Sequence, residues 1–212
     1  MPKQNRVTPD GQIIATSARG TFMGNRGILH NAQQEIVKPF AHKAWIICRL
    51  SFKGRRRKLM QPGKYTELFF LDEATALAAG HRPCFECRRA GARAFKDAWL
   101  AGNPQLGFDD SVSVRELDGV LHAERLTDAY YIKDRKKRTF LVALDTLPNG
   151  TFILREERPY LVWEDALLPW SPAGYGSPQS RPRGVQTAVL TPPSTVAALA
   201  HSYLPELHES AF

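Results

Sequence analysis

Three cysteines are the residues of this sequence whose type and spacing could do chemistry. Cys84 and Cys87 form a Cys-x-x-Cys pair after Pro83, and Cys48 lies well upstream. Such a pair, at a tight turn leading into a helix, suits two corners of a zinc tetrahedron with Zn–S near about 2.3 Å. The positive end of that helix and the neighbouring arginines favour thiolates. We therefore expect Zn bound by Cys48, Cys84 and Cys87.

A histidine is the expected fourth ligand. His30 is the first choice, because its turn-rich segment can fold back freely. His42 comes second and needs a bend near Pro39, since an extended chain would hold it roughly 20 Å from Cys48. His81, just before Cys84, could be the ligand or could simply pack its ring against neighbouring side chains. Water, or no fourth ligand, is the remaining choice.

The cysteines also allow two readings without metal. A redox-active Cys-x-x-Cys pair is one, although the βαβ context typical of thioredoxin-like proteins is missing here. Inert buried thiols are the other. The odd number of cysteines, three, and the absence of a secretory signal argue against a disulfide scaffold.

The segment around the Cys-x-x-Cys pair resembles part of a known protein family. Residues 74–89 read ATALAAGHRPCFECRR, and this resembles the second half of the zinc-binding module of the bacterial Ada DNA repair proteins. The resemblance covers about residues 45–93. It implies a short helix before the pair, a zinc ion held by cysteines and contact with DNA. That family uses four cysteines, one of which accepts a methyl group from a phosphotriester; this chain has three, so the resemblance implies zinc and DNA contact rather than methyl transfer.

The charge of the chain is unevenly distributed. The net charge is +8, but residues 1–105 carry +11 and residues 106–212 carry −3. An excess of cations in one part indicates an anionic partner, with nucleic acid, and DNA in particular, as the first choice; a basic solvated surface is the alternative. The expected phosphate-binding residues are Lys53, Arg55, Arg56, Arg57, Lys58, Arg82, Arg88 and Arg89.

Two other classes of function stay open. His122 and Glu124, together with Pro83 and the Cys-x-x-Cys pair, supply the elements of a zinc deaminase signature in reversed order, so a zinc-dependent hydrolase or deaminase is one alternative. A non-catalytic ligand-binding module in the second half is the other, since aromatic side chains end several of its strands: Trp163, Trp170 and Tyr175.

The elements that must position these residues indicate an α+β fold. Strand-like segments at 43–52 and 64–71 are joined by a cationic loop and predict an antiparallel hairpin. Helices are expected at 72–80, capped by Asp72 and ended by Gly80, from about 85–86 to 100, and at 113–126, capped by Ser113. Later segments have the amino-acid composition of β-strands, and a hairpin is predicted at Asn149-Gly150.

The expected organisation is therefore a basic, zinc-tied hairpin–helix region at residues 1–105. A helix and a mostly antiparallel β region of unknown role follow at 106–212. No apolar stretch approaches the roughly 20 residues that a bilayer requires, and the N-terminal residues lack the apolar core of a secretory signal. We accordingly expect a cytoplasmic protein with no membrane partner.

Overall fold

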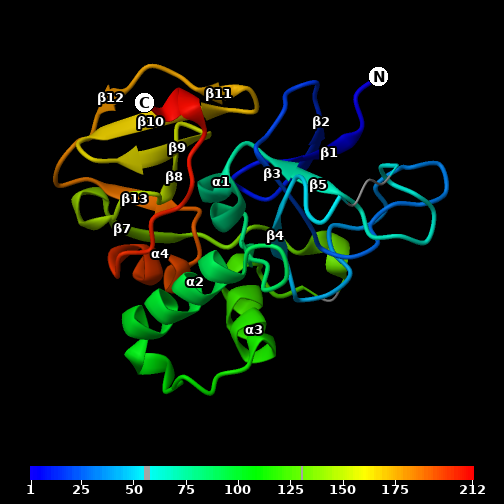
Figure 1. The fold of residues 1–212 in the computed structure, drawn as a ribbon. Coiled ribbons are helices and arrows are strands. Elements are labelled where there is room, and N and C mark those ends of the chain that lie inside the picture. Colours follow the sequence, from blue (N-terminus) through cyan, green and yellow to red (C-terminus); the bar gives the residue numbers. More distant parts are fainter. Residues whose placement is uncertain (55–57, 130) are drawn as a thin grey trace.

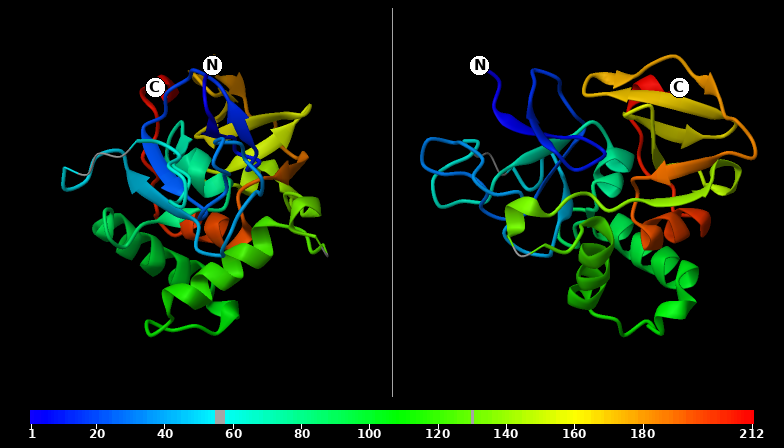
Figure 2. Two further views of the ribbon diagram at one scale, coloured as in Figure 1. Left: turned by 90° about the vertical axis from the view of Figure 1, so that its right-hand side faces the viewer. Right: turned by 180° about the vertical axis from the view of Figure 1, so that it is seen from behind.

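The computed structural model describes residues 1–54, 58–129 and 131–212, which form two sheets and the helices around them (Figure 1). The sheets are mostly antiparallel, and the expected α+β class is confirmed. Helix α1 lies between the sheets (Figure 1 and the right-hand view of Figure 2). The helices are α1 Glu73–Ala78, α2 Arg89–Gly102, α3 Val114–Arg125 and α4 Pro193–Ala200.

The first sheet has the strand order β2-β1-β5-β3-β4-β6. Its strands are β1 Gln4–Val7, β2 Ile13–Ala15, β3 Phe22–Asn25, β4 Ile46–Arg49, β5 Leu68–Phe70 and β6 Arg82–Pro83. The predicted hairpin between the segments of β4 and β5 is wrong, because β3 lies between them and pairs antiparallel with both. Gly24 permits this close insertion: a Cβ there would lie 2.0 Å from the carbonyl oxygen of Ile46.

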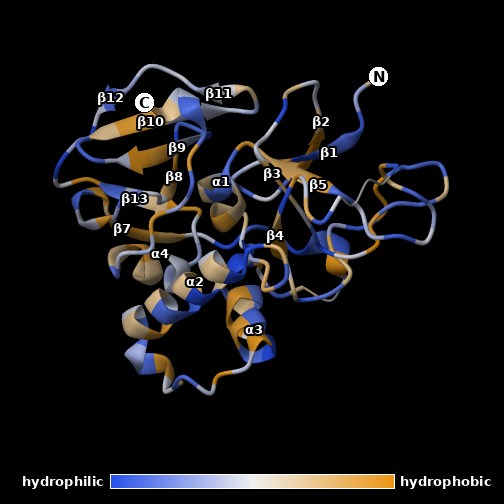
Figure 3. Cartoon of the chain, in the orientation of Figure 1, coloured by the Kyte–Doolittle hydropathy of each residue, from blue (hydrophilic) through white to orange (hydrophobic). Residues whose placement is uncertain are grey.

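The second sheet has the order β11-β10-β9-β8-β13-β7, with β12 paired to β10. Its strands are β7 Phe140–Ala143, β8 Phe152–Arg155, β9 Arg158–Trp163, β10 Ala166–Ser171, β11 Gly174–Tyr175, β12 Gln179–Ser180 and β13 Gln186–Val189. The predicted hairpin at Asn149-Gly150 is also wrong, since β7 and β8 each pair with β13 rather than with each other. Strands β9 and β10 are strongly hydrophobic (Figure 3).

The helix boundaries follow local signals closely. Asp72 caps α1 by accepting from the backbone N–H of Thr75, and Gly80 takes a positive φ of 89° after it. Ser113 and Glu116 form a reciprocal capping box at the start of α3. These expectations are confirmed. Helix α2 begins only at Arg89, later than expected, because the chain around the Cys-x-x-Cys pair is still in a turn.

The hydrophobic cores draw on both halves of the sequence. One core packs Leu68 of the first sheet with Leu121 of α3 and Tyr203 near the C-terminus. A second packs Ala74 of α1 against Leu161 of the second sheet. The division expected after residue 105 therefore does not separate two cores. No helix among the described residues is long and apolar enough to cross a membrane.

Candidate metal centre and its pocket

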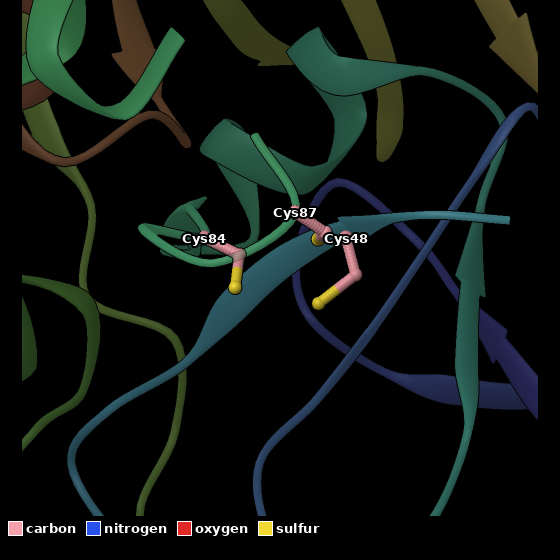
Figure 4. Close-up of side chains that lie close together, drawn as sticks. All are labelled: Cys48, Cys84 and Cys87. Atoms are coloured by element: carbon pink, nitrogen blue, oxygen red, sulfur yellow. The ribbon is translucent and has the colours of Figure 1, made fainter. Parts of the chain in front are cut away.

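Strand register brings the first two cysteines together. Strands β4 and β6 are parallel, and Ile47 is paired with Pro83. Cys48 and Cys84 are the residues that directly follow this pair on the two strands. The backbone N–H of Cys84 donates to the carbonyl oxygen of Ile47 at 2.9 Å and continues the pairing. Cys87 returns to the same place through the turn that precedes α2 (Figure 4).

The three sulfur atoms form a compact group. They all lie within 4.8 Å of one another, and this is the one group of three or more histidine, cysteine or acidic ligands found across residues 1–54, 58–129 and 131–212. Sulfurs bound to one tetrahedral zinc ion lie roughly 3.5–4 Å apart, so a small adjustment would accommodate the metal. The predicted convergence of Cys48, Cys84 and Cys87 is confirmed, and together they can hold a metal ion.

Hydrogen bonds at the sulfurs favour negative charge on Cys84. The thiol of Cys48 donates to its sulfur, which lowers the pKa of Cys84 to about 5, and the N–H groups of Cys87 and Glu86 act in the same direction. The N–H of Glu86 lies 3.4 Å from Sγ of Cys84. The same thiol contact, followed by burial, raises the pKa of Cys48. A bound metal cation would take the place of the shared proton and balance the negative charge of the sulfurs.

The sulfur group opens into a pocket of about 320 Å³, which we call the thiol pocket. Because all three cysteines line it, the fourth position of a tetrahedral ion held by them would face this space. Aromatic rings and two buried polar side chains complete much of the wall. These residues are Phe52, Tyr65, Phe69, Asn25 and Glu67.

The sequence does not indicate this pocket, because one of its strands lies in the glycine-rich segment of residues 20–27. Met23 and Asn25 line the pocket from β3, the strand hidden in that glycine-rich segment. Phe69 lies on β5, the strand on the other side of β3, and Glu67 comes just before β5. The pair Phe22-Met23 is the one apolar signal that marks a strand there, and three nearby glycines mask it.

The structure does not bring His30 to the sulfurs. Its Nδ1 lies 2.7 Å from the Thr66 hydroxyl and its Nε2 lies 3.2 Å from the Gln61 carbonyl oxygen. Since a carbonyl only accepts, Nε2 carries the proton and Nδ1 accepts from Thr66. Both ring nitrogens are thereby used in joining two loops, and the expected role of His30 as fourth ligand is not supported.

His81 is also removed from the cysteine cluster. It is fully buried between the rings of Trp45 and Phe70, and its Nε2 accepts from Nε of Arg26 at 3.2 Å. Burial, followed by the charges of Arg26 and Arg125, lowers its pKa well below the ordinary value. This histidine is therefore a neutral core residue.

Two of the expected phosphate-binding arginines are committed elsewhere. Arg82 donates to both carboxylate oxygens of Asp118 at 2.8 Å, and Arg88 donates to both oxygens of Glu73 at 2.6 and 2.8 Å. Each arginine is only 5% exposed. A buried guanidinium requires such partners, and these ion pairs leave neither arginine exposed in the way that contact with a phosphate requires.

The other expected phosphate-binding residues keep an exposed position where the structure describes them. Lys53, Lys58 and Arg89 are exposed, whereas Arg55, Arg56 and Arg57 lie outside the described residues. Phe52 and Leu59, which bracket the cationic loop (residues 53–58), both line the thiol pocket. The loop therefore leaves from, and returns to, the edge of the candidate metal site.

The deaminase signature is not assembled. His122 packs edge-on against Phe40, and its Nδ1 lies 2.8 Å from a guanidinium nitrogen of Arg125, away from the thiol pocket. Glu124 accepts from the backbone and hydroxyl of Ser194 at 3.1 and 2.6 Å. These two side chains hold α3 to its surroundings.

The aromatic residues of the second half also have structural partners. Tyr175 donates to Asp72 at 2.7 Å and Trp170 donates to Thr75 at 3.1 Å, which ties the second sheet to α1. Trp163 packs edge-on against Phe212, with ring centres 5.9 Å apart. These contacts account for the three rings without a bound ligand.

The comparisons with known proteins add no relative. No protein-family model matches the chain, and neither a curated protein nor a solved structure matches it.

Proposed function

We propose that this chain is a zinc protein whose three-cysteine site stands at the edge of a nucleic-acid-binding surface. The observation that carries the proposal is the convergence of Cys48, Cys84 and Cys87 on one point beside the thiol pocket. Three thiolates suit zinc among the common divalent ions, whereas magnesium and calcium take oxygen ligands. Backbone N–H groups directed at the sulfurs also fit a site that holds negative charge.

The nucleic-acid part of the proposal rests on charge next to that site. The first 105 residues carry a net charge of +11. Arg49 lines the thiol pocket, where it pairs with Glu206 at 3.4 Å at an exposed position, and the exposed lysines Lys53 and Lys58 flank the pocket residues Phe52 and Leu59. Arg89 is exposed at the start of α2, two residues after Cys87. Cations gathered at one edge would bind phosphates and release counterions.

The metal is tested on protein purified without added metal. We expect close to one equivalent of zinc per chain by elemental analysis, and loss of most of it in Cys84→Ser. Met23→Leu is the matched control, because Met23 is the register partner of Cys48 and its change leaves all three thiols in place. Less than half an equivalent in the unaltered chain, with no uptake from a zinc buffer, would overturn the proposal.

Nucleic-acid contact is tested by a salt titration of binding to labelled DNA. We expect measurable affinity at about 50 mM salt and a log–log slope that reports the phosphate contacts. The double variant Lys58→Gln, Arg89→Gln should weaken binding and reduce the slope by about two. Arg155→Gln, an exposed change in the second sheet, should leave both unchanged. Absence of binding to any strand at that salt would refute this part.

The thiol pocket favours a zinc-dependent hydrolase or deaminase as the second candidate function. A fourth metal position that faces a pocket is the arrangement of catalytic rather than structural zinc sites. Cobalt-substituted protein tests this candidate, since an open position would change its visible spectrum when imidazole is added. A spectrum indifferent to added ligands would leave a purely structural zinc.

A further inference from the structure

A second concavity adjoins the thiol pocket and has a different chemical character. It measures about 470 Å³ and shares the wall residues Leu50, Leu59 and Phe69 with the thiol pocket. Three cations line it, and none of the described residues in its wall carries a carboxylate. We call it the basic groove; its wall consists of Pro2, Lys3, Asn5, Arg6, Thr16, Ser17, Arg19, Gly20 and the three shared residues.

Neutral acceptors hold Arg6 in the basic groove, and among the described residues no carboxylate pairs with it. Arg6 donates through Nε to the Ala18 carbonyl oxygen at 2.7 Å and through Nη1 to Asn5 Oδ1 at 2.5 Å. These acceptors are neutral, so the guanidinium keeps its full charge. Arg19 is exposed beside it, and burial together with this neighbouring charge lowers the pKa of Arg6. An anion seated between the two arginines would relieve their repulsion.

An unsatisfied amide lies in the wall of the same groove. Asn5 is fully buried, and among the described residues its Nδ2 has no hydrogen-bond partner, although its Oδ1 accepts from Arg6. A buried donor without an acceptor costs about 1–3 kcal/mol, so it marks a place where an acceptor belongs. Phosphate oxygens supply acceptors and negative charge at once.

The thiol pocket next to this groove is suited to a planar ring. Phe52, Tyr65 and Phe69 provide aromatic surfaces, and the buried polar groups of Asn25 and Glu67 lie in the same wall. Aromatic side chains stack on any nucleobase, and amide and carboxylate groups hydrogen-bond to base edges. Phe69 serves both concavities, with the guanidinium of Arg6 4.7 Å from its ring centre.

We propose that the two concavities together bind a single-stranded nucleic acid, with one unpaired base in the thiol pocket and its neighbouring phosphate in the basic groove. A base can enter a concave site only when it is unstacked, so a duplex would have to flip one out at a cost. The proposal rests on the proposed function, since it names the form of nucleic acid that this surface takes. It places the base directly beside the face of the sulfur group that a metal ion leaves open.

The test compares four labelled probes of one length: a single strand of DNA, the same strand in RNA, the DNA duplex, and a DNA strand whose central nucleotides lack bases. We expect one of the intact single strands to bind about tenfold more tightly than the duplex, and removal of the bases to cost about tenfold. A preference for DNA or for RNA identifies the type of nucleic acid that the protein binds, and either result supports the inference. Equal affinity for the strand with and without bases would overturn it.

Variants at the junction of the two concavities locate the binding. Leu50 is 51% exposed, so Leu50→Glu should fold normally while it places a carboxylate between groove and pocket. We expect about a tenfold loss of single-strand affinity, whereas Leu204→Glu, at a side chain 71% exposed elsewhere, should change nothing. Arg19→Gln should lower the salt slope on single strands by about 0.7.

The outcomes separate this inference from the proposed function. If no probe binds, the nucleic-acid part of the proposed function fails and the inference fails with it. If the duplex binds as well as the strand, with sensitivity to Lys58→Gln, Arg89→Gln but not to Leu50→Glu, the basic edge is correct and the base pocket is wrong. Zinc content is measured on every variant, so loss of metal is recognised independently.

Discussion

Arg82 and Asp118 join the first sheet to helix α3 through a two-point ion pair in the interior. Nε and Nη2 of the arginine donate to the two carboxylate oxygens, each at 2.8 Å, and both side chains are 6% exposed. Arg82 belongs to β6, two residues before Cys84. The pair therefore holds in place the strand that delivers the Cys-x-x-Cys turn to β4.

Removal of the Asp118 carboxylate should lower the free energy of unfolding. Asp118→Ala leaves Arg82 charged and buried, so we expect a loss of about 3–5 kcal/mol in the free energy of unfolding, measured by urea denaturation. Asp110→Ala, at an exposed acidic residue, should stay within about 0.5 kcal/mol of the unaltered protein. A loss for Asp118→Ala no larger than for this control would show that the pair is not what holds β6.

Gly24 should tolerate no side chain. A Cβ at this position would lie 2.0 Å from the Ile46 carbonyl oxygen and 2.9 Å from the ring of Phe70, so Gly24→Ala has to push β3 away from β4. Because Cys48 is on β4, we expect both a lower unfolding midpoint and a lower zinc content. The matched change is Gly119→Ala in α3, where nothing lies within 4 Å of the new methyl group; it should raise stability by about 0.4–1 kcal/mol. Equal effects of the two substitutions would contradict the close approach.

Local sequence signals predicted the helices of this fold but not the order of its strands. Caps such as Asp72 and Ser113 act within a few residues, so the helices they begin were predicted correctly. Both predicted hairpins were wrong for one reason: a strand distant in sequence, β3 in one sheet and β13 in the other, lies between the two segments. Short-range turn signals carry no information about such an insertion.

The candidate site shows the same division between local and distant signals. The convergence of Cys48 with Cys84 and Cys87 was predictable, because a Cys-x-x-Cys pair needs further ligands to hold a metal ion and Cys48 is the remaining cysteine. The roles of Arg82 and Arg88 were not, since their carboxylate partners lie on other elements and the sequence shows only a positive run. The thiol pocket depends on β3, which the glycine-rich sequence around it does not indicate, so the pocket was not predictable either.

His122 should make stability fall at mildly acidic pH. Burial, and then the charges of Arg125, Arg135 and Lys43, lowers its pKa to about 4 from an ordinary 6.5, while Asp128 acts in the opposite direction. A depressed histidine pKa means that the unfolded chain binds the proton first, so stability is full above pH 6.5 and declines as pH falls toward 4. His81, also buried and neutral, adds to the same decline.

The measurement for His122 is the unfolding free energy of the unaltered protein and of His122→Gln between pH 7 and pH 4. Glutamine offers an acceptor to Arg125 and does not titrate, so the variant should lose less stability across this window. Carboxylates titrate in both proteins and cancel in the difference. Parallel curves would show that His122 keeps an ordinary pKa in the folded state.

Zinc that binds the three thiols should stabilise the folded chain, by an amount that grows with the logarithm of the zinc concentration. The sulfurs converge only in the folded state, so zinc at about 100 times its dissociation constant should add about 2.7 kcal/mol to the unfolding free energy. Metal binding requires thiolates, and the pKa of Cys48 is raised, so the gain should shrink as pH is lowered. Thermal unfolding of chelator-treated protein, with and without added zinc, measures it. Met23→Leu should keep the gain and Cys48→Ser should lose most of it, whereas a gain that survives the loss of Cys48 would place the ion elsewhere.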